Sequence, residues 1–97
     1  EKAIENYKKA IEKLEKGNNL VRLSNAHFNL AVSYYFKNDF EGMKRECENA
    51  IKLSDKVGEI FNKGYALMNF AAACVQLNEL DKAEKALKDA IKIAKKI

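Results

Sequence analysis

The sequence contains no proline and no tryptophan, and among its 97 residues only four are glycine and one is histidine. Because proline and glycine are the usual interruptions of a helix, a chain that is 47% hydrophobic and 33% charged and nearly lacks both favours an all-α fold without strands. No apolar run approaches the roughly 18 residues that a transmembrane helix needs, and no targeting leader opens the chain. The length predicts one domain with a single modest core.

The charge and the cysteine content exclude several classes of protein. The excess of 18 basic over 14 acidic residues is mild compared with the clustered basic surface of a nucleic-acid-binding protein. Cys47 and Cys74 have neither the CxxC spacing of a metal or redox site nor the density of a secreted disulfide framework. We therefore expect a cytoplasmic protein that binds neither membrane nor nucleic acid.

The chain repeats itself with a period of 40 residues, so that AHFNLAVSYYFKNDF at 26–40 returns as ALMNFAAACVQLNEL at 66–80. Residues 1–17 match the end of the same unit, because Ala10 and Ile11 precede Ala50 and Ile51 by one period. We expect one array over residues 1–97, made of the second helix of a partial repeat (1–17) and two full repeats (18–57 and 58–97). Identical pairs include Ala26 and Ala66, Asn29 and Asn69, Ala31 and Ala71, Asn38 and Asn78, and Ala50 and Ala90.

Each repeat divides into two helical patterns, separated by a short break. Asn38 tolerates the left-handed conformation that ends a helix, and Asp39 can accept the free N–H groups that begin the next one. Asn78 and Glu79 mark the same place one period later. The apolar spacing predicts five helices, at about 1–16, 20–37, 40–55, 59–77 and 80–97. The core stripes are expected to contain Leu20, Leu23, His27, Leu30, Ala31 and Tyr34, then Phe40, Met43, Cys47, Ala50 and Ile51, and, mirrored, Leu80, Ala83, Leu87, Ala90 and Ile91.

This spacing resembles the tetratricopeptide repeat pattern W-x2-L-G-x2-Y followed by A-x3-F and A. His27, Leu30, Ala31 and Tyr34 occupy the first part of the pattern, and Leu67, Phe70, Ala71 and Cys74 occupy it again. The departures are the missing tryptophan and closing proline, alanine in place of glycine, and a period of 40 rather than about 34 residues, which resembles the longer variety of the family. The resemblance implies a right-handed α-solenoid of antiparallel helix pairs.

The resemblance also implies a binding surface, because in tetratricopeptide arrays the first helices line a concave groove that receives an extended peptide or a partner's helix. On a wheel of about 100° per residue, one arc beside the core stripe lies free on each first helix. The peptide-binding residues expected there are Asn29, Asn69, Phe28, Val32, Tyr35, Phe36, Tyr65, Met68 and Gln76.

Asn29 and Asn69 are the sharpest candidates, because an amide can donate to a peptide carbonyl and accept from a peptide N–H without reading a side chain. First helices about 10 Å apart would space the two amides about three residues along an extended ligand. The alternative is that these asparagines bond only to adjacent backbone and that the aromatic residues pack against a missing repeat.

Catalysis finds little support in this sequence. His27 lies on the inward stripe, Cys47 and Cys74 replace core residues, and no carboxylate cluster accompanies them, so we expect no enzyme activity, metal or cofactor. The expected function is a noncatalytic protein–protein interaction scaffold. Two alternatives are self-association through exposed end helices, such as the stripe of residues 1–16, and weak electrostatic binding of nucleic acid through the six lysines of residues 80–97.

Overall fold

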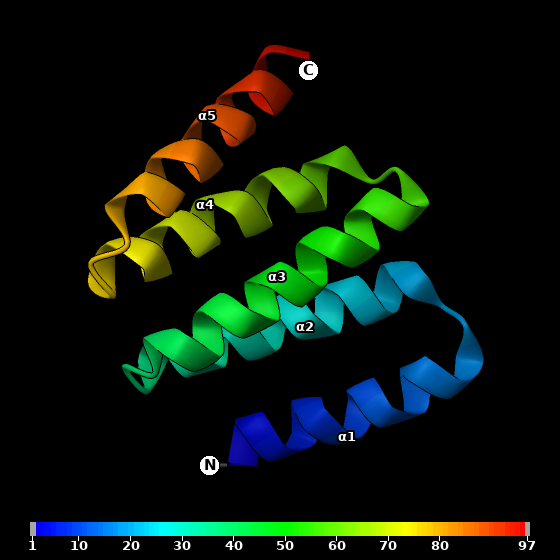
Figure 1. The fold of residues 1–97 in the computed structure, drawn as a ribbon. Helices are drawn as coiled ribbons and strands as arrows, with labels where there is room; N and C mark the ends of the chain where they lie inside the picture. The colour runs from blue at the N-terminus through cyan, green and yellow to red at the C-terminus, as the bar shows by residue number, and fades with distance from the viewer. Residues whose placement is uncertain (1, 97) are drawn as a thin grey trace.

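The structure, a computed structural model, describes residues 2–96 as five α-helices joined by short turns, with no strand among these residues (Figure 1). The expectation of an all-helical chain is confirmed. The predicted helix bounds differ from the observed ones by at most two residues. The helices are α1 (Lys2–Gly17), α2 (Leu20–Phe36), α3 (Phe40–Val57), α4 (Ile60–Gln76) and α5 (Leu80–Lys96).

Every turn contains one residue in the left-handed conformation, and these residues are spaced 20 apart: Asn18 (φ 56°), Asn38 (φ 59°), Gly58 (φ 68°) and Asn78 (φ 60°). Asparagine and glycine tolerate this conformation better than other residues, which is why the helices end there. The predicted stops at Asn38 and Asn78 are confirmed. α3 runs to Val57, two residues past the predicted end, because Gly58 rather than an earlier residue stops it.

Side-chain caps begin three of the helices. Asn19 accepts a hydrogen bond from the N–H of Arg22 (3.1 Å), and Asp39 accepts one from the N–H of Gly42 (2.9 Å). Glu59 accepts one from Phe61 at 2.9 Å. These bonds satisfy N–H groups that have no partner within the helix, and they confirm the role expected of Asp39.

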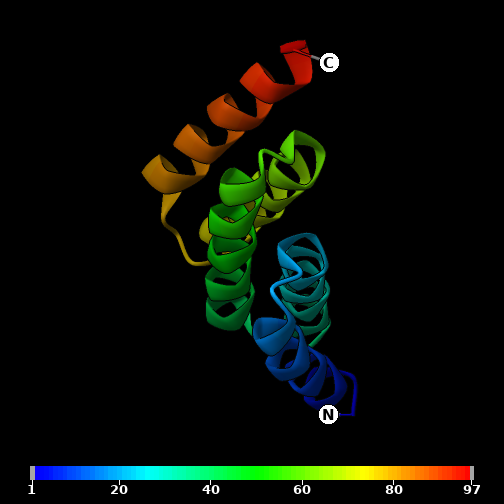
Figure 2. The ribbon, with the colours of Figure 1, turned by 90° about the vertical axis from the view of Figure 1, so that its right-hand side faces the viewer.

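The order of packing makes the stack curved. Each helix packs against the one that follows it, as the stacked ribbons of Figures 1 and 2 show. In addition, α2 contacts α4. Among residues 2–96, however, α1 and α3 have no Cα atoms within 8 Å of each other, and neither do α3 and α5. Because the first helices of neighbouring pairs touch and the second helices do not, α2 and α4 lie on the inner side of the curve. Open clefts of about 530 Å³ and 320 Å³ mark the outer side, above α2 and α4 respectively.

The core follows the predicted stripes where a helix has neighbours on both sides. Small side chains lie at the closest contacts, as expected, since they allow helices to approach to about 8–10 Å. The buried alanines of this kind are Ala31, Ala50, Ala71, Ala83 and Ala90. Gly42 is also buried, and a Cβ atom there would lie 2.8 Å from Cγ of Tyr34, so this glycine provides a close contact beside the buried Met43.

Both ends of the stack correct the sequence expectations. The predicted core residues Leu80, Leu87 and Ile91 are 58%, 45% and 55% exposed, because within residues 2–96 α5 packs only against α4. At the other end, the alternative of self-association assumes an exposed stripe on residues 1–16, but Ile11 is buried and Tyr7 packs half-buried against the core. No helix among the described residues is both long and apolar enough to cross a bilayer.

Candidate functional site

A hollow of about 350 Å³ opens on the inner side of the stack, between α2 and α4. Its walls are largely apolar and aromatic, with a single amide, and two of its aromatic side chains are prominent: Tyr35 is 49% exposed and Phe36 is 77% exposed. The hollow is lined by Val32, Tyr35 and Phe36 of α2, Met43 of α3, and Asn69 and Ala72 of α4.

The aromatic wall is held by edge-to-face contacts. The ring of Tyr35 lies 5.4 Å from that of Phe36 at an interplanar angle of 74°, and 6.5 Å from that of Phe40 at 65°. These distances and angles are those that aromatic quadrupoles favour. Because Tyr35 is held by a neighbour in α2 and another in α3, one wall of the hollow is ordered before any ligand arrives.

Asn69 presents its amide to this hollow while one of its N–H groups is in use. Its Nδ2 donates to the backbone carbonyl of Tyr65, one turn earlier, at 2.9 Å. An asparagine amide carries two donors and one acceptor, so one N–H and Oδ1 remain available for a ligand. The hydrogen bond from Asn69 to adjacent backbone, which the alternative interpretation requires, is therefore present. It uses only one of the three hydrogen-bonding groups of the amide.

The other predicted residues do not all meet in this hollow. Asn29 is exposed and does not line it, and its backbone carbonyl accepts a hydrogen bond from Ser33. Tyr65 and Met68 line a second hollow, of about 370 Å³, between α4 and α5. Phe28 is half-buried and Gln76 is exposed, and neither lines either hollow. Of the nine predicted residues, four therefore line the inner hollow, two line the second hollow and three line neither.

Sequence reasoning missed one contact on the inner side. Nδ2 of Asn62 donates to Oδ1 of Asn25 at 2.8 Å, which joins α4 to α2 near their first turns. The repeat gave no signal for this bond, because residue 22, one period before Asn62, is an arginine. The pair supports the contact between α2 and α4 on which the inner hollow depends.

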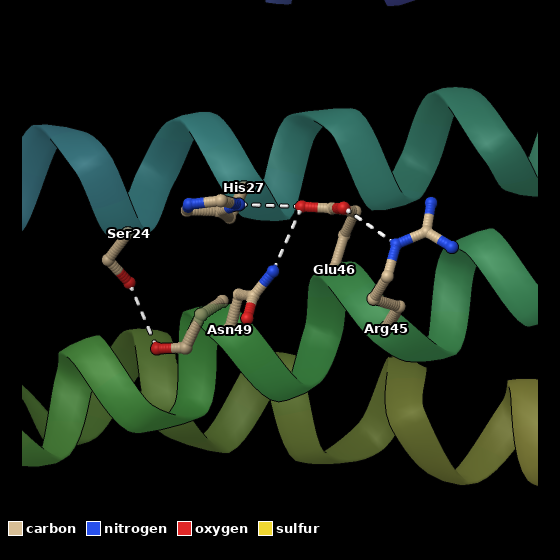
Figure 3. A network of polar contacts seen from close by, with 6 residues as sticks. Ser24, His27, Arg45, Glu46 and Asn49 are labelled. Atoms are coloured by element: carbon tan, nitrogen blue, oxygen red, sulfur yellow. Dashed lines mark hydrogen bonds and ion pairs between the residues drawn. The ribbon is translucent and has the colours of Figure 1, made fainter. Parts of the chain in front are cut away.

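A polar network crosses the interface between α2 and α3 (Figure 3). Nδ1 of His27 lies 2.6 Å from Oε1 of Glu46, whose carboxylate also accepts from Asn49 (3.4 Å) and from Nε of Arg45 (3.3 Å). Since the carboxylate is the acceptor, Nδ1 carries the hydrogen. Nearby, the buried hydroxyl of Ser24 lies 3.1 Å from that of Ser54. His27, which stands where the family pattern has tryptophan, therefore has a polar partner that the sequence did not reveal.

Opposing effects set the pKa of Glu46, which is 6% exposed. Burial raises the pKa of this carboxyl, but the hydrogen bond and charge of His27, with the hydrogen bonds from Asn49 and Arg45, outweigh burial and bring the pKa below its usual value. The ionised form of Glu46 is thus the one that the fold stabilises, as expected for a group that joins two helices.

The cysteines have the environment of core residues. Both are fully buried, and burial raises the pKa of Cys47 to about 12 and also raises the pKa of Cys74. A thiol that stays protonated is a poor nucleophile. Within residues 2–96, no group of three or more histidine, cysteine, aspartate or glutamate side chains is placed to hold a metal ion.

Comparison with known proteins agrees with this geometry. A family model described as tetratricopeptide repeat matches residues 24–56 and 61–97, which correspond to the pairs α2–α3 and α4–α5. No significant match was found to a curated protein or to a solved structure. Repeats of this kind generally mediate protein–protein interactions and are typically noncatalytic. With both helix pairs matched and all described helices stacked in sequence, the chain belongs to the tetratricopeptide repeat family.

Proposed function

We propose that this chain is a noncatalytic scaffold that holds an extended peptide or a partner's helix against the inner side of the stack. The observation that carries the proposal is the hollow of about 350 Å³ between α2 and α4, with its exposed aromatic wall and its single amide. In this proposal the chain is one array, with residues 1–17 as the second helix of a partial repeat and residues 18–57 and 58–97 as full repeats.

The lining of the hollow indicates the chemistry of the ligand. Val32, Tyr35 and Phe36 offer apolar and aromatic contact, so an apolar or aromatic ligand side chain would be the anchor. Asn69 would then bond to the ligand backbone through its remaining donor and acceptor. None of the described residues that line the hollow is lysine or arginine, which argues against recognition of a terminal carboxylate.

Selection of peptides tests the proposal. A displayed library of random 12-residue peptides, selected on the full chain, is expected to yield binders with an apolar or aromatic anchor. Phe36→Ser is expected to weaken them by about tenfold or more, because burying a large apolar side chain contributes about 1.5–3 kcal/mol. Leu80→Ser is the matched control, since it removes an exposed apolar side chain outside the hollow. Equal loss in the two variants would contradict the proposal.

The asparagines are tested separately. Asn69→Ala is expected to weaken the selected peptides by about threefold to tenfold, the range for one or two hydrogen bonds. Asn29→Ala and the double variant show whether Asn29 adds to the capture of a longer peptide. Circular dichroism confirms that the helical content is kept. Unchanged affinity in the double variant would refute a role for these amides. It would not bear on the aromatic wall, which Phe36→Ser tests.

A further inference from the structure

The end of the stack formed by α4 and α5 carries an uncovered apolar surface, here called the end face. Its large side chains are between 45% and 60% exposed, although they lie on two helices that pack against each other. At one end it encloses the hollow of about 370 Å³ that contains Tyr65 and Met68. The end face consists of Phe61, Tyr65, Met68 and Val75 of α4 and Leu80, Leu87 and Ile91 of α5.

The end face repeats the surface on which α4 itself is seated. One period of 40 residues relates Leu87 to Cys47 and Ile91 to Ile51. Cys47 is fully buried in a cluster with Ala73 of α4, and Ile51 packs half-buried against the cluster formed by α4 and α5. The surface of α3 is therefore covered by α4, whereas the equivalent surface of α5 is exposed among the described residues. The end face thus has the features of a docking surface for one more helix.

Two ion pairs join α4 and the turn after it to α3. Nζ of Lys63, in the first turns of α4, lies 2.6 Å from Oδ1 of Asp55 on α3. Just past the other end of α4, Oε1 of Glu79 lies 2.6 Å from Nζ of Lys44 on α3. The seated helix thus contributes a base near its start and an acid just past its end.

At the end face both of these charges are reversed. One period after Asp55 stands Lys95, and one period after Lys44 stands Glu84. Both residues are exposed. A helix seated on the end face in the orientation of α4 would therefore need an acid near its start and a base just past its end. That arrangement also agrees with the helix dipole, which favours negative charge at the N-terminus and positive charge at the C-terminus.

We propose that the end face binds one amphipathic helix of a partner protein, with an acidic residue in its first turns and a basic residue just past its last turn. All five helices of residues 2–96 already lie in the stack, so none of them covers the face. A helix with the charges of α4 is a poor occupant, since its base would face Lys95 and its acid would face Glu84. This surface is distinct from the inner hollow of the proposed function.

Two synthetic peptides test the charge rule. One is residues 59–79 of this chain, and the other is the same peptide with Lys63→Glu and Glu79→Lys, so the two have equal composition and net charge. Both carry blocked ends and a fluorophore, and their binding to the full chain is measured by anisotropy. The charge-swapped peptide is expected to bind about threefold to tenfold more tightly, with the difference narrowing in 1 M salt. Equal affinities would overturn the proposal.

Variants of the full chain locate the binding. Lys95→Glu is expected to abolish the preference, because each peptide then makes one favourable and one unfavourable charge contact. Lys85→Glu, the same charge change in the outer cleft, is expected to leave the preference unchanged. Met68→Asp is expected to weaken both peptides by about tenfold. Equal effects of Lys95→Glu and Lys85→Glu would overturn the assigned site.

The two other possible occupants give distinct results. A concentration-dependent dimer in sedimentation that the charge-swapped peptide does not dissociate would assign the end face to a second copy. If the charge-swapped peptide binds only when it is joined to the chain after residue 97, the natural occupant of the end face is a further repeat. Either result overturns the partner helix, and neither bears on Phe36→Ser, which tests the inner hollow.

Discussion

The helix pairs α2–α3 and α4–α5 have the same turns and the same spacing of contacts, but different side chains join them. In the first pair, Ser24 contacts Ser54 and His27 contacts Glu46. One period later these positions are Gly64 with Ala94 and Leu67 with Ala86. Leu67 and Ala86 pack in one apolar cluster, so an apolar pair takes the place of the hydrogen-bonded pair there, whereas Gly64 and Ala94 line the hollow between α4 and α5.

The two helix pairs also differ in the sizes of the side chains at a second contact. In the first pair the buried ring of Tyr34 lies against Gly42, which has no side chain to oppose it. In the second pair Cys74 is the smaller counterpart of Tyr34, and Lys82 stands at the position of the glycine. Where the first helix is large at this contact, the second helix must be small.

Replacing the polar pair by its apolar counterpart should have the largest effect. His27→Leu alone leaves the buried carboxylate of Glu46 without its closest partner, and we expect it to lower the free energy of unfolding by about 3 kcal/mol. Adding Glu46→Ala recreates the combination of Leu67 with Ala86 and should return the stability to within about 1 kcal/mol of the wild type. Urea unfolding followed by circular dichroism measures both. If the losses of stability in His27→Leu and Glu46→Ala simply add in the double variant, the polar pair and the apolar pair are not equivalent.

The two glycines in helix interiors, Gly42 and Gly64, should change the free energy of unfolding in opposite directions when each is replaced by alanine. In Gly42→Ala the new methyl group would lie within 3 Å of Tyr34, and we expect a loss of about 1–3 kcal/mol. In Gly64→Ala the nearest atom is Cγ2 of Ile93 at 3.5 Å, an ordinary contact, so we expect a gain of about 0.5–1 kcal/mol from helix propensity. The same urea experiment decides. A gain in both variants would mean that Tyr34 moves aside.

The smallest expected difference between the two helix pairs is in how their stability depends on acidic pH. Because the pKa of Glu46 is lower in the folded chain than its ordinary value of 4.5, its contribution to stability is complete above that pH and is lost as the pH falls through the folded pKa. Glu46→Gln removes this titration, so its stability should fall less steeply than that of the wild type below about pH 4.5. Unfolding curves at several pH values give the two slopes. Parallel slopes would show that Glu46 does not couple to folding.

Much of the fold could be predicted because the signals are local. Apolar spacing predicted all five helices, and the asparagines predicted the breaks at Asn38 and Asn78. Asp39 caps α3 as expected, whereas the carboxylate of Glu79 pairs with Lys44 and Lys82. The residues of the inner aromatic wall also followed from helix periodicity, since Val32, Tyr35 and Phe36 do line one hollow.

The rest depends on which helices are neighbours, and periodicity within a helix does not contain that information. Leu87 has the spacing of a core residue and is exposed because, among residues 2–96, α5 packs against α4 alone. Tyr65 and Met68 lie at the end of the stack for the same reason, away from Asn69. Glu46 looks like a solvated acid in the sequence, and only the approach of His27 from α2 makes it a buried partner.

The separation of α3 from α5 has a mechanical consequence. Bending the array about the line where α2 meets α4 widens or narrows a cleft that is already open, so the motion exchanges few buried contacts. The same bend changes the distance between Phe36 on α2 and Asn69 on α4. We therefore expect the array to bend more easily between the two helix pairs than within either pair, and this bend would change the width of the hollow between α2 and α4.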